Sequence, residues 1–253
     1  MPADYVDVRG ELMIDLIKSN RLEGEYMDSL AEAKSKIIHV CRRIYEREMV
    51  ASNDGNVTVR IGEDRILATP TGMSKGFLTE DDLVLTDLDG NVVEGGGAVT
   101  SEIKIYIQIY RSRADVRAAV HAHPLYATAF AACGKTVSTD VLPESANSLG
   151  YVPLVPYATP GTEQLASRIG EYLADHEVFL LQNHGALALG GDVVEAYHRL
   201  ECLEHTARIV YLAQTIGGMS RLTPEQIGGI FEVHGAKTSP RIREAGRRMS
   251  RVG

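Results

Sequence analysis

The stretch Ala119-Val120-His121-Ala122-His123-Pro124 constrains the fold of this chain more than any other. Successive side chains of a β-strand point to opposite faces, so histidines two positions apart project from the same face. The residues before His121 are largely apolar and partly β-branched, which predicts a half-buried strand that ends at the proline. The two imidazoles could share one metal ion, or could simply form hydrogen bonds with their neighbours.

A third histidine, His184, follows a second hydrophobic run, Val178-Phe179-Leu180-Leu181, and precedes Gly185. We expect this run to be a strand as well, with residues 186–189 as its hairpin partner. Three neutral imidazoles and one open position are typical of a catalytic rather than a structural metal site. This hypothesis requires the three side chains to converge in the folded chain.

Composition predicts one globular domain without a nucleic-acid partner. The chain has 253 residues, of which 44% are hydrophobic, and its composition does not change along the sequence. The net charge of −8 and the pI of about 5.5 argue against binding to nucleic acid. Near the C-terminus we expect a solvated helix face formed by Arg241, Arg243, Arg247, Arg248 and Arg251.

The cysteines and the N-terminal residues bear on the cellular compartment. Cys41, Cys133 and Cys202 have no paired spacing, so we expect small buried side chains rather than disulfides or metal ligands. The N-terminal residues are acidic where a signal peptide would be basic, and no apolar stretch approaches ~18 residues. We therefore expect a cytoplasmic protein that has no contact with membranes.

The pattern of apolar residues predicts an N-terminal extension over residues 1–26, a core domain over 27–217 and a helical tail over 218–253. The extension includes a short amphipathic piece over 12–17. We expect strands over 57–61, 66–69, 83–86, 92–94 and 152–155, the last of them at a sheet edge because it contains a proline. We expect helices over 27–49, 125–133 and 162–174, and a long one that Asp192 caps and that ends near Gly217.

Two loops are rich in small and hydroxyl residues. Asp54-Gly55-Asn56 is a turn signal, and Pro70-Thr71-Gly72 opens a loop that runs to Gly76. Such loops present free backbone N–H groups, which suit an anion such as phosphate. Turn formation alone would explain the same residues equally well.

Five segments together resemble the class II aldolase and adducin head family, over about residues 27–217. In chain order they are Asp54-Gly55-Asn56-Val57-Thr58, Thr69-Pro70-Thr71-Gly72, Thr100-Ser101-Glu102, His121-Ala122-His123 and Gln182-Asn183-His184-Gly185. The resemblance implies a single α/β domain with a mainly antiparallel central sheet flanked by helices. It also implies a homo-oligomer, commonly a tetramer, with sites at the subunit boundaries.

The resemblance also decides between two patterns in residues 103–110. Isoleucine alternates there with other residues, which favours a strand. A helix with Ser101 as its N-cap would instead place Ile103, Tyr106, Ile107 and Tyr110 on one face. We choose the helix, because the resemblance implies it.

The resemblance assigns a role to each of these residues. It implies that His121, His123 and His184 hold a divalent metal, zinc in the first place and manganese or cobalt as alternatives. It implies that Glu102 is the catalytic acid and base. The positions that would hold a substrate phosphate are Gly55, Asn56, Thr71, Gly72, Thr100 and Ser101.

We expect a metal-dependent lyase that cleaves a phosphorylated ketose reversibly into dihydroxyacetone phosphate and an aldehyde. A divalent ion would stabilise the negative charge that aldol cleavage leaves on oxygen, and a carboxyl group would move a proton beside the carbonyl. The first alternative is a metal-dependent decarboxylase of a hydroxylated aromatic acid on the same framework. The second is a non-catalytic assembly module like the adducin head, which the retained histidines and Glu102 disfavour.

Overall fold

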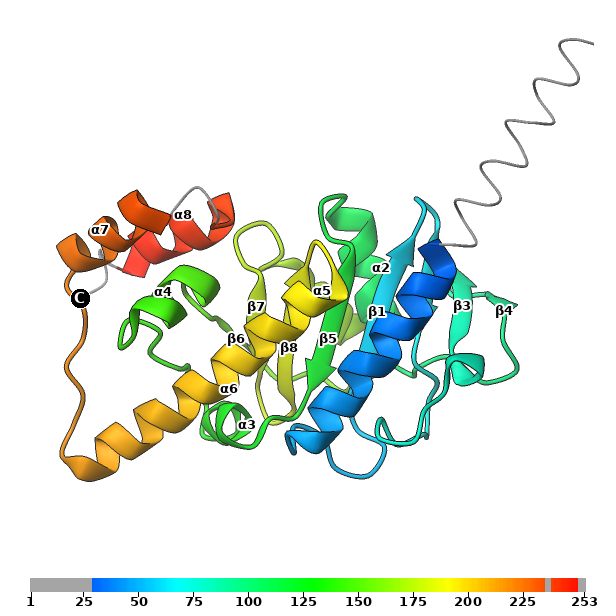
Figure 1. Cartoon of the computed structure of the whole chain (residues 1–253), viewed down its shortest axis with the longest axis horizontal. Coiled ribbons are helices and arrows are strands. Elements are labelled where there is room, and N and C mark those ends of the chain that lie inside the picture. The colour runs from blue at the N-terminus through cyan, green and yellow to red at the C-terminus, as the bar shows by residue number, and fades with distance from the viewer. Residues whose placement is uncertain (1–28, 235–237, 250–253) are drawn as a thin grey trace, which may run out of the picture.

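The computed structural model describes residues 29–234 and 238–249, which form one α/β domain (Figure 1). An eight-stranded sheet has the order β4-β3-β2-β1-β5-β8-β7-β6. The strands are β1 Asn56–Ile61, β2 Arg65–Ala68, β3 Val84–Asp87, β4 Val92–Glu94, β5 Ala118–Ala122, β6 Leu154–Val155, β7 Val178–Leu181 and β8 Gly185–Gly190. Every neighbouring pair is antiparallel except β6 and β7, so the predicted, mainly antiparallel sheet is confirmed.

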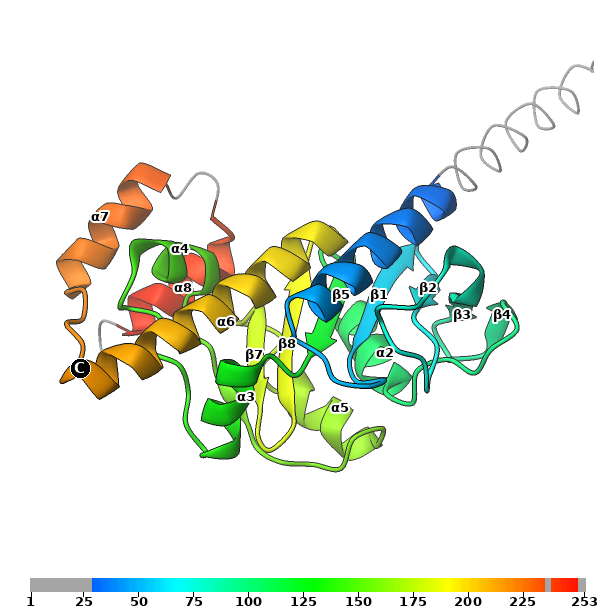
Figure 2. The same ribbon diagram turned by 60° about the horizontal axis from the view of Figure 1, so that its bottom comes forward.

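Helices cover both faces of the sheet (Figure 2). They comprise one over residues 29–46, the short helix η1 Glu80–Asp82, α2 Ile103–Ser112, α3 Leu125–Ala132, α4 Pro143–Leu149, α5 Glu163–Gly170, α6 Val193–Ile216, α7 Pro224–His234 and α8 Pro240–Met249. The helix over 29–46, α3 and α6 share one hydrophobic core with the sheet, and α2 and α5 share another on the opposite face.

Alternation along β5 decides which side chains reach each core. Val120 packs in the core with α6, whereas Ala119 packs in the core with α2. His121 is two residues beyond Ala119, so its imidazole points to the α2 face of the sheet. The strand therefore delivers His121 to the layer from which Glu102 approaches.

The helix predicted over residues 103–110 is confirmed and extends to Ser112, but two details of its prediction are wrong. Glu102, and not Ser101, occupies the N-cap position. The buried face is formed by Ile105, Tyr106, Ile109 and Tyr110. Ile103 and Ile107 lie instead at the border of the layer, next to Gly90 in the β3–β4 turn, where their side chains cover the turn.

The predicted caps of two helices agree with the structure, whereas one helix was not predicted and the burial of one cysteine was predicted wrongly. The side chain of Thr162 caps α5, and that of Asp192 caps α6. Helix α4 was not predicted, although its N-terminal proline is a helix-start signal. Cys133 is exposed, because it follows the last residue of α3, so burial was wrong for this cysteine. The amphipathic piece expected over residues 12–17 lies outside the described residues.

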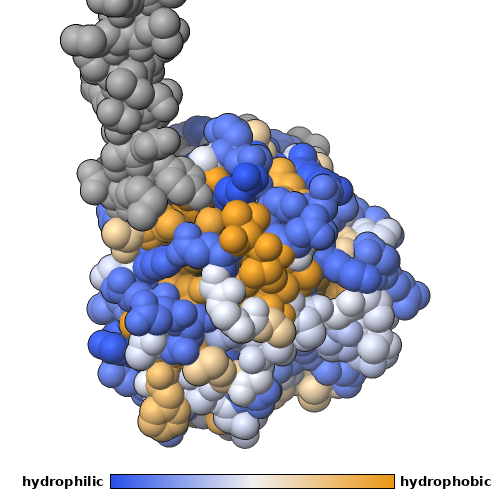
Figure 3. All heavy atoms as spheres, turned by 90° about the vertical axis from the view of Figure 1, so that its right-hand side faces the viewer, coloured by the Kyte–Doolittle hydropathy of each residue, from blue (hydrophilic) through white to orange (hydrophobic). Residues whose placement is uncertain are grey.

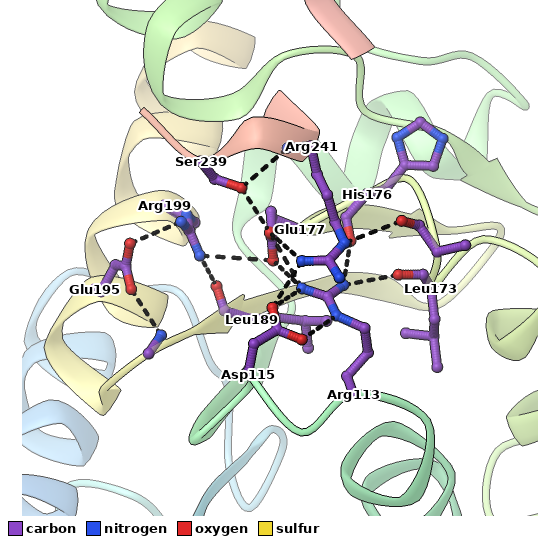
Figure 4. Close-up of polar contacts among 12 residues, drawn as sticks. Arg113, Asp115, Leu173, His176, Glu177, Leu189, Glu195, Arg199, Ser239 and Arg241 are labelled. Carbon is purple, nitrogen blue, oxygen red and sulfur yellow. Dashed lines mark hydrogen bonds and ion pairs between the residues drawn. The ribbon is translucent and has the colours of Figure 1, made fainter. Parts of the chain in front are cut away.

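The C-terminal helices do not simply present arginines to solvent. Arg241 forms an ion pair with Asp115 (2.7 Å) and donates to the carbonyl oxygen of Ala174 (3.0 Å). Figure 4 shows this arginine and Ser239 beside Glu177, a buried carboxylate that also contacts Arg113. The predicted solvated face is therefore wrong for Arg241, because acidic groups of the sheet layer attract it.

Arg243 corrects the same prediction, since its Nε atom is buried without a hydrogen-bond partner. The side chains of Arg247, Arg248 and Arg251 lie outside the described part of the chain.

Residues 113–115 precede β5 and Glu177 precedes β7, whereas the three histidines lie at the other ends of these strands. The C-terminal segment therefore docks at the end of the sheet opposite the histidines.

Strand β4 forms one edge of the sheet and is its most exposed strand. Val92 and Val93 are 48% and 53% exposed, and apolar side chains gather on this end of the molecule (Figure 3). The strand has only three residues, which limits pairing of its free edge with other chains.

Within the described residues, no helix combines the length and the apolar composition needed to span a membrane.

Candidate metal centre

The three histidines converge at one end of the sheet. His121 is the fourth residue of β5, His123 follows that strand directly, and His184 lies in the turn between β7 and β8. One ligand nitrogen from each ring lies within 4.8 Å of the other two. The neighbouring strands β5 and β8 thus bring together residues that are more than sixty positions apart in the sequence.

Gly185 allows this approach. A Cβ atom at position 185 would lie 2.5 Å from the Ala122 carbonyl oxygen and 2.5 Å from Cδ2 of His123. Real Cβ atoms essentially never come this close to other heavy atoms. Only glycine therefore lets the turn that carries His184 pack against the end of β5.

The hydrogen bonds of the rings indicate where their lone pairs point. Nδ1 of His121 lies 2.8 Å from the carbonyl oxygen of Ala186, and Nδ1 of His123 lies 3.2 Å from the carboxylate of Asp54. Both oxygens can only accept, so each Nδ1 carries the hydrogen and each Nε2 presents a lone pair. Burial and the neighbouring His123 lower the pKa of His121 to about 3, which keeps its ring neutral.

The two Nε2 atoms face each other at 3.2 Å. With no hydrogen between them, two lone pairs at this distance repel unless a cation lies nearby. Zinc–nitrogen distances of about 2.0–2.1 Å in a tetrahedral site place two ligand nitrogens about 3.3–3.4 Å apart. Burial also lowers the pKa of His184 to about 3. The three rings therefore fit a divalent cation well.

Glu102 lies beside this nitrogen cluster at the start of α2. Its Oε2 atom is 3.4 Å from Nε2 of His121 and accepts a hydrogen bond from the Asn56 side chain (2.6 Å). Its Oε1 atom is 3.6 Å from Nε2 of His184 and has no hydrogen-bond partner. Burial raises the pKa of this carboxyl group. A carboxyl group with one free oxygen and a raised pKa suits proton transfer.

A cavity of ≈ 180 Å³ opens beside Glu102. All six residues predicted to hold phosphate line it, together with Glu102, His123 and His184. The Thr100 hydroxyl donates to the Asn56 side-chain oxygen, so Thr100 holds the amide that in turn holds Glu102. Gly55 and Gly72 have positive φ angles of 78° and 74°, a backbone conformation that glycine tolerates best.

Sequence reasoning missed several residues that shape this site. Asp54 orients His123, and the sequence marked it only as part of the predicted turn and of a segment that carries the family resemblance. Glu204 of α6 accepts hydrogen bonds from the backbone N–H groups of Tyr126 and Ala127, in the first turn of α3 just after His123. Asn53 and Pro160 also line the cavity.

A larger cavity of ≈ 340 Å³ lies between α4, α6 and residues 238–242, and none of the three converging histidines lines it.

Comparison with known proteins places these observations in a family context. The family model of the Class II Aldolase and Adducin N-terminal domain matches residues 35–211. An L-fuculose phosphate aldolase of Methanococcus maripaludis is 37% identical over 182 residues, which cover 72% of this chain and 98% of that relative. A 3-oxo-tetronate 4-phosphate decarboxylase of Haemophilus influenzae is 30% identical over 192 residues, covering 74% and 90%. A solved structure of an L-fuculose 1-phosphate aldolase superposes with a TM-score of 0.74 at 29% identity, covering 81% and 96%.

Proposed function

The chain belongs to the class II aldolase and adducin family, and from this premise we propose that it is a metal-dependent aldolase acting on a phosphorylated ketose. The reaction is reversible cleavage into dihydroxyacetone phosphate and an aldehyde. The observation that carries the proposal is the placement of Glu102 against three converging imidazoles at one cavity. The relatives named as L-fuculose phosphate aldolases support it.

His121, His123 and His184 hold the metal, which we propose to be zinc. When bound, a divalent ion supplies Lewis acidity that stabilises negative charge on the substrate oxygen beside the breaking bond. Glu102 transfers a proton at the carbon next to the carbonyl, giving it in cleavage and removing it in condensation. Asn56 fixes the carboxyl group from one side, so that Oε1 stays free for the substrate.

The glycine and hydroxyl loops hold the substrate phosphate in the cavity that they line. Gly55, Asn56, Thr71, Gly72, Thr100 and Ser101 are the proposed contacts. Binding energy gained at the phosphate orients the reacting carbons against Glu102. A tetrameric assembly and a cytoplasmic location are part of this proposal, on the strength of the family resemblance and the sequence.

The direct test supplies the metal-loaded protein with a panel of ketose 1-phosphates and measures release of dihydroxyacetone phosphate. We expect release from at least one ketose phosphate, and none from the metal-free protein. Metal-loaded protein that releases none from the whole panel would contradict the proposal. Protein that binds no metal would favour the non-catalytic module instead.

A second candidate is decarboxylation of a phosphorylated 3-oxo sugar acid, favoured by the relative named as a 3-oxo-tetronate 4-phosphate decarboxylase. The same carboxyl group and phosphate loops would serve this reaction, because loss of carbon dioxide also leaves negative charge on oxygen. This substrate differs from the predicted aromatic acid, because the relative is named for a phosphorylated sugar acid. Release of carbon dioxide rather than dihydroxyacetone phosphate would identify this activity.

A further inference from the structure

Lys75 is a buried cation for which the proposed chemistry has no role. Its side chain is only 1% exposed, and it lies in the loop that follows Thr71 and Gly72. Burying an ammonium group costs several kcal/mol unless nearby groups compensate it. Its two hydrogen-bond acceptors are uncharged carbonyl oxygens, and burial lowers its pKa although the nearby Asp54 carboxylate acts in the opposite direction. The burial of this ammonium group therefore costs stability.

The ammonium group connects the two loops that line the cavity. Nζ donates to the carbonyl oxygen of Asn53 (3.1 Å) and to that of Met73 (2.9 Å). Asn53 lines the cavity and precedes Asp54, which orients His123. Met73 directly follows Gly72, which lines the cavity from the other loop. One side chain therefore fixes the spacing of both loops and places a positive charge just behind the cavity wall.

The next residue anchors the loop to the helix over 29–46. A Cβ atom on Gly76 would lie 2.6 Å from the ring of Tyr45, so glycine permits the close contact there. The Phe77 ring packs on the same tyrosine, with 5.9 Å between the ring centroids. The contacts with Tyr45 fix the loop against the helix over 29–46. The Lys75 side chain extends from this fixed part of the loop to the carbonyl oxygen of Asn53.

We propose that Lys75 is a positioning residue for anion binding, which holds the two loops in register and adds positive potential to the phosphate end of the cavity. The inference rests on the proposed function, because it takes the anion to be the substrate phosphate. It requires no contact between Lys75 and the substrate. A unit charge acting across a short stretch of protein interior is sufficient to change anion affinity by about tenfold.

The test is calorimetric titration of inorganic phosphate into metal-loaded wild-type protein and the Lys75→Met variant, with metal content measured on the same samples. Methionine keeps most of the length of lysine and an apolar, unbranched stem, but removes the charge and both hydrogen bonds. We expect phosphate affinity to fall about tenfold or more, with metal content unchanged. The matched control is Lys34→Met, which removes a lysine that pairs with Glu94, neither of which lines the cavity, and which we expect to leave phosphate affinity unchanged.

The outcomes separate the two proposals. Wild-type affinity in folded Lys75→Met would overturn the role of Lys75 and leave the proposed function intact. Wild-type protein that binds no phosphate would overturn the phosphate site, and the role of Lys75 with it. If Lys75→Met does not fold, Lys75→Gln retains an amide donor without the charge, and wild-type phosphate affinity in that variant would overturn the role of the positive charge.

Discussion

Substituting Gly185 by alanine tests how closely the histidine turn must approach β5. The new Cβ atom would lie 2.5 Å from both the Ala122 carbonyl oxygen and a ring carbon of His123. An ordinary contact begins near 3.4 Å, so the turn must move by up to about 1 Å. Ligand distances at a metal tolerate only about ±0.2 Å, and the neighbouring ligand His184 moves with the turn.

We expect Gly185→Ala to weaken metal binding by roughly 10–100-fold, the range typical of disturbed support around a metal ligand. The assay is competition for zinc against a chromophoric chelator. Gly96→Ala is the matched control, because a Cβ atom there meets nothing within 4 Å. If Gly185→Ala bound zinc as tightly as the control, the close approach of the turn would not be needed for the site.

Three further predictions concern charged groups. Glu102→Gln should keep its metal content but lose turnover in the cleavage assay, whereas unchanged turnover would place the proton carrier elsewhere. Asp54→Asn should weaken zinc binding by about 10–100-fold, because the carboxylate orients His123; wild-type affinity in the chelator assay would deny that role. The hydrogen bond from Arg113 lowers the pKa of Asp115 to about 2. Asp115 therefore adds stability that is full above about pH 4 and is lost as the pH falls toward 2. In thermal unfolding, Asp115→Asn should be less stable than wild type at pH 6, with the difference shrinking toward pH 2; a difference that stays constant would contradict this reasoning.

The parts of the site that follow from local pattern could be predicted from the sequence. A spacing of two residues put His121 and His123 on one strand face, and a second apolar run ending in a turn marked His184. The helix after Glu102 could not be predicted in this way. Its isoleucines alternate because both flanks of the helix are partly covered, by the sheet layer and by the β3–β4 turn.

The remaining features depend on contacts between distant segments, which leave no periodic signal. The sequence shows Lys75 only as a lysine in a loop. In the structure its side chain is buried and donates to the carbonyl oxygen of Asn53. Nothing in the sequence around Glu204 indicates that its carboxylate accepts the N–H groups of Tyr126 and Ala127 in the first turn of α3. Arg241 was expected in solvent because its partner Asp115 is more than a hundred residues away.

A crystal structure of the protein grown with zinc, with anomalous diffraction recorded at the zinc edge, measures the ligand set directly. We predict one zinc ion bound by Nε2 of His121, by Nε2 of His123 and by a ring nitrogen of His184, at about 2.0–2.1 Å, with the Glu102 carboxyl group beside it. An ion held by any other set of side chains, or a strong anomalous peak elsewhere and none among the three imidazoles, would contradict the account.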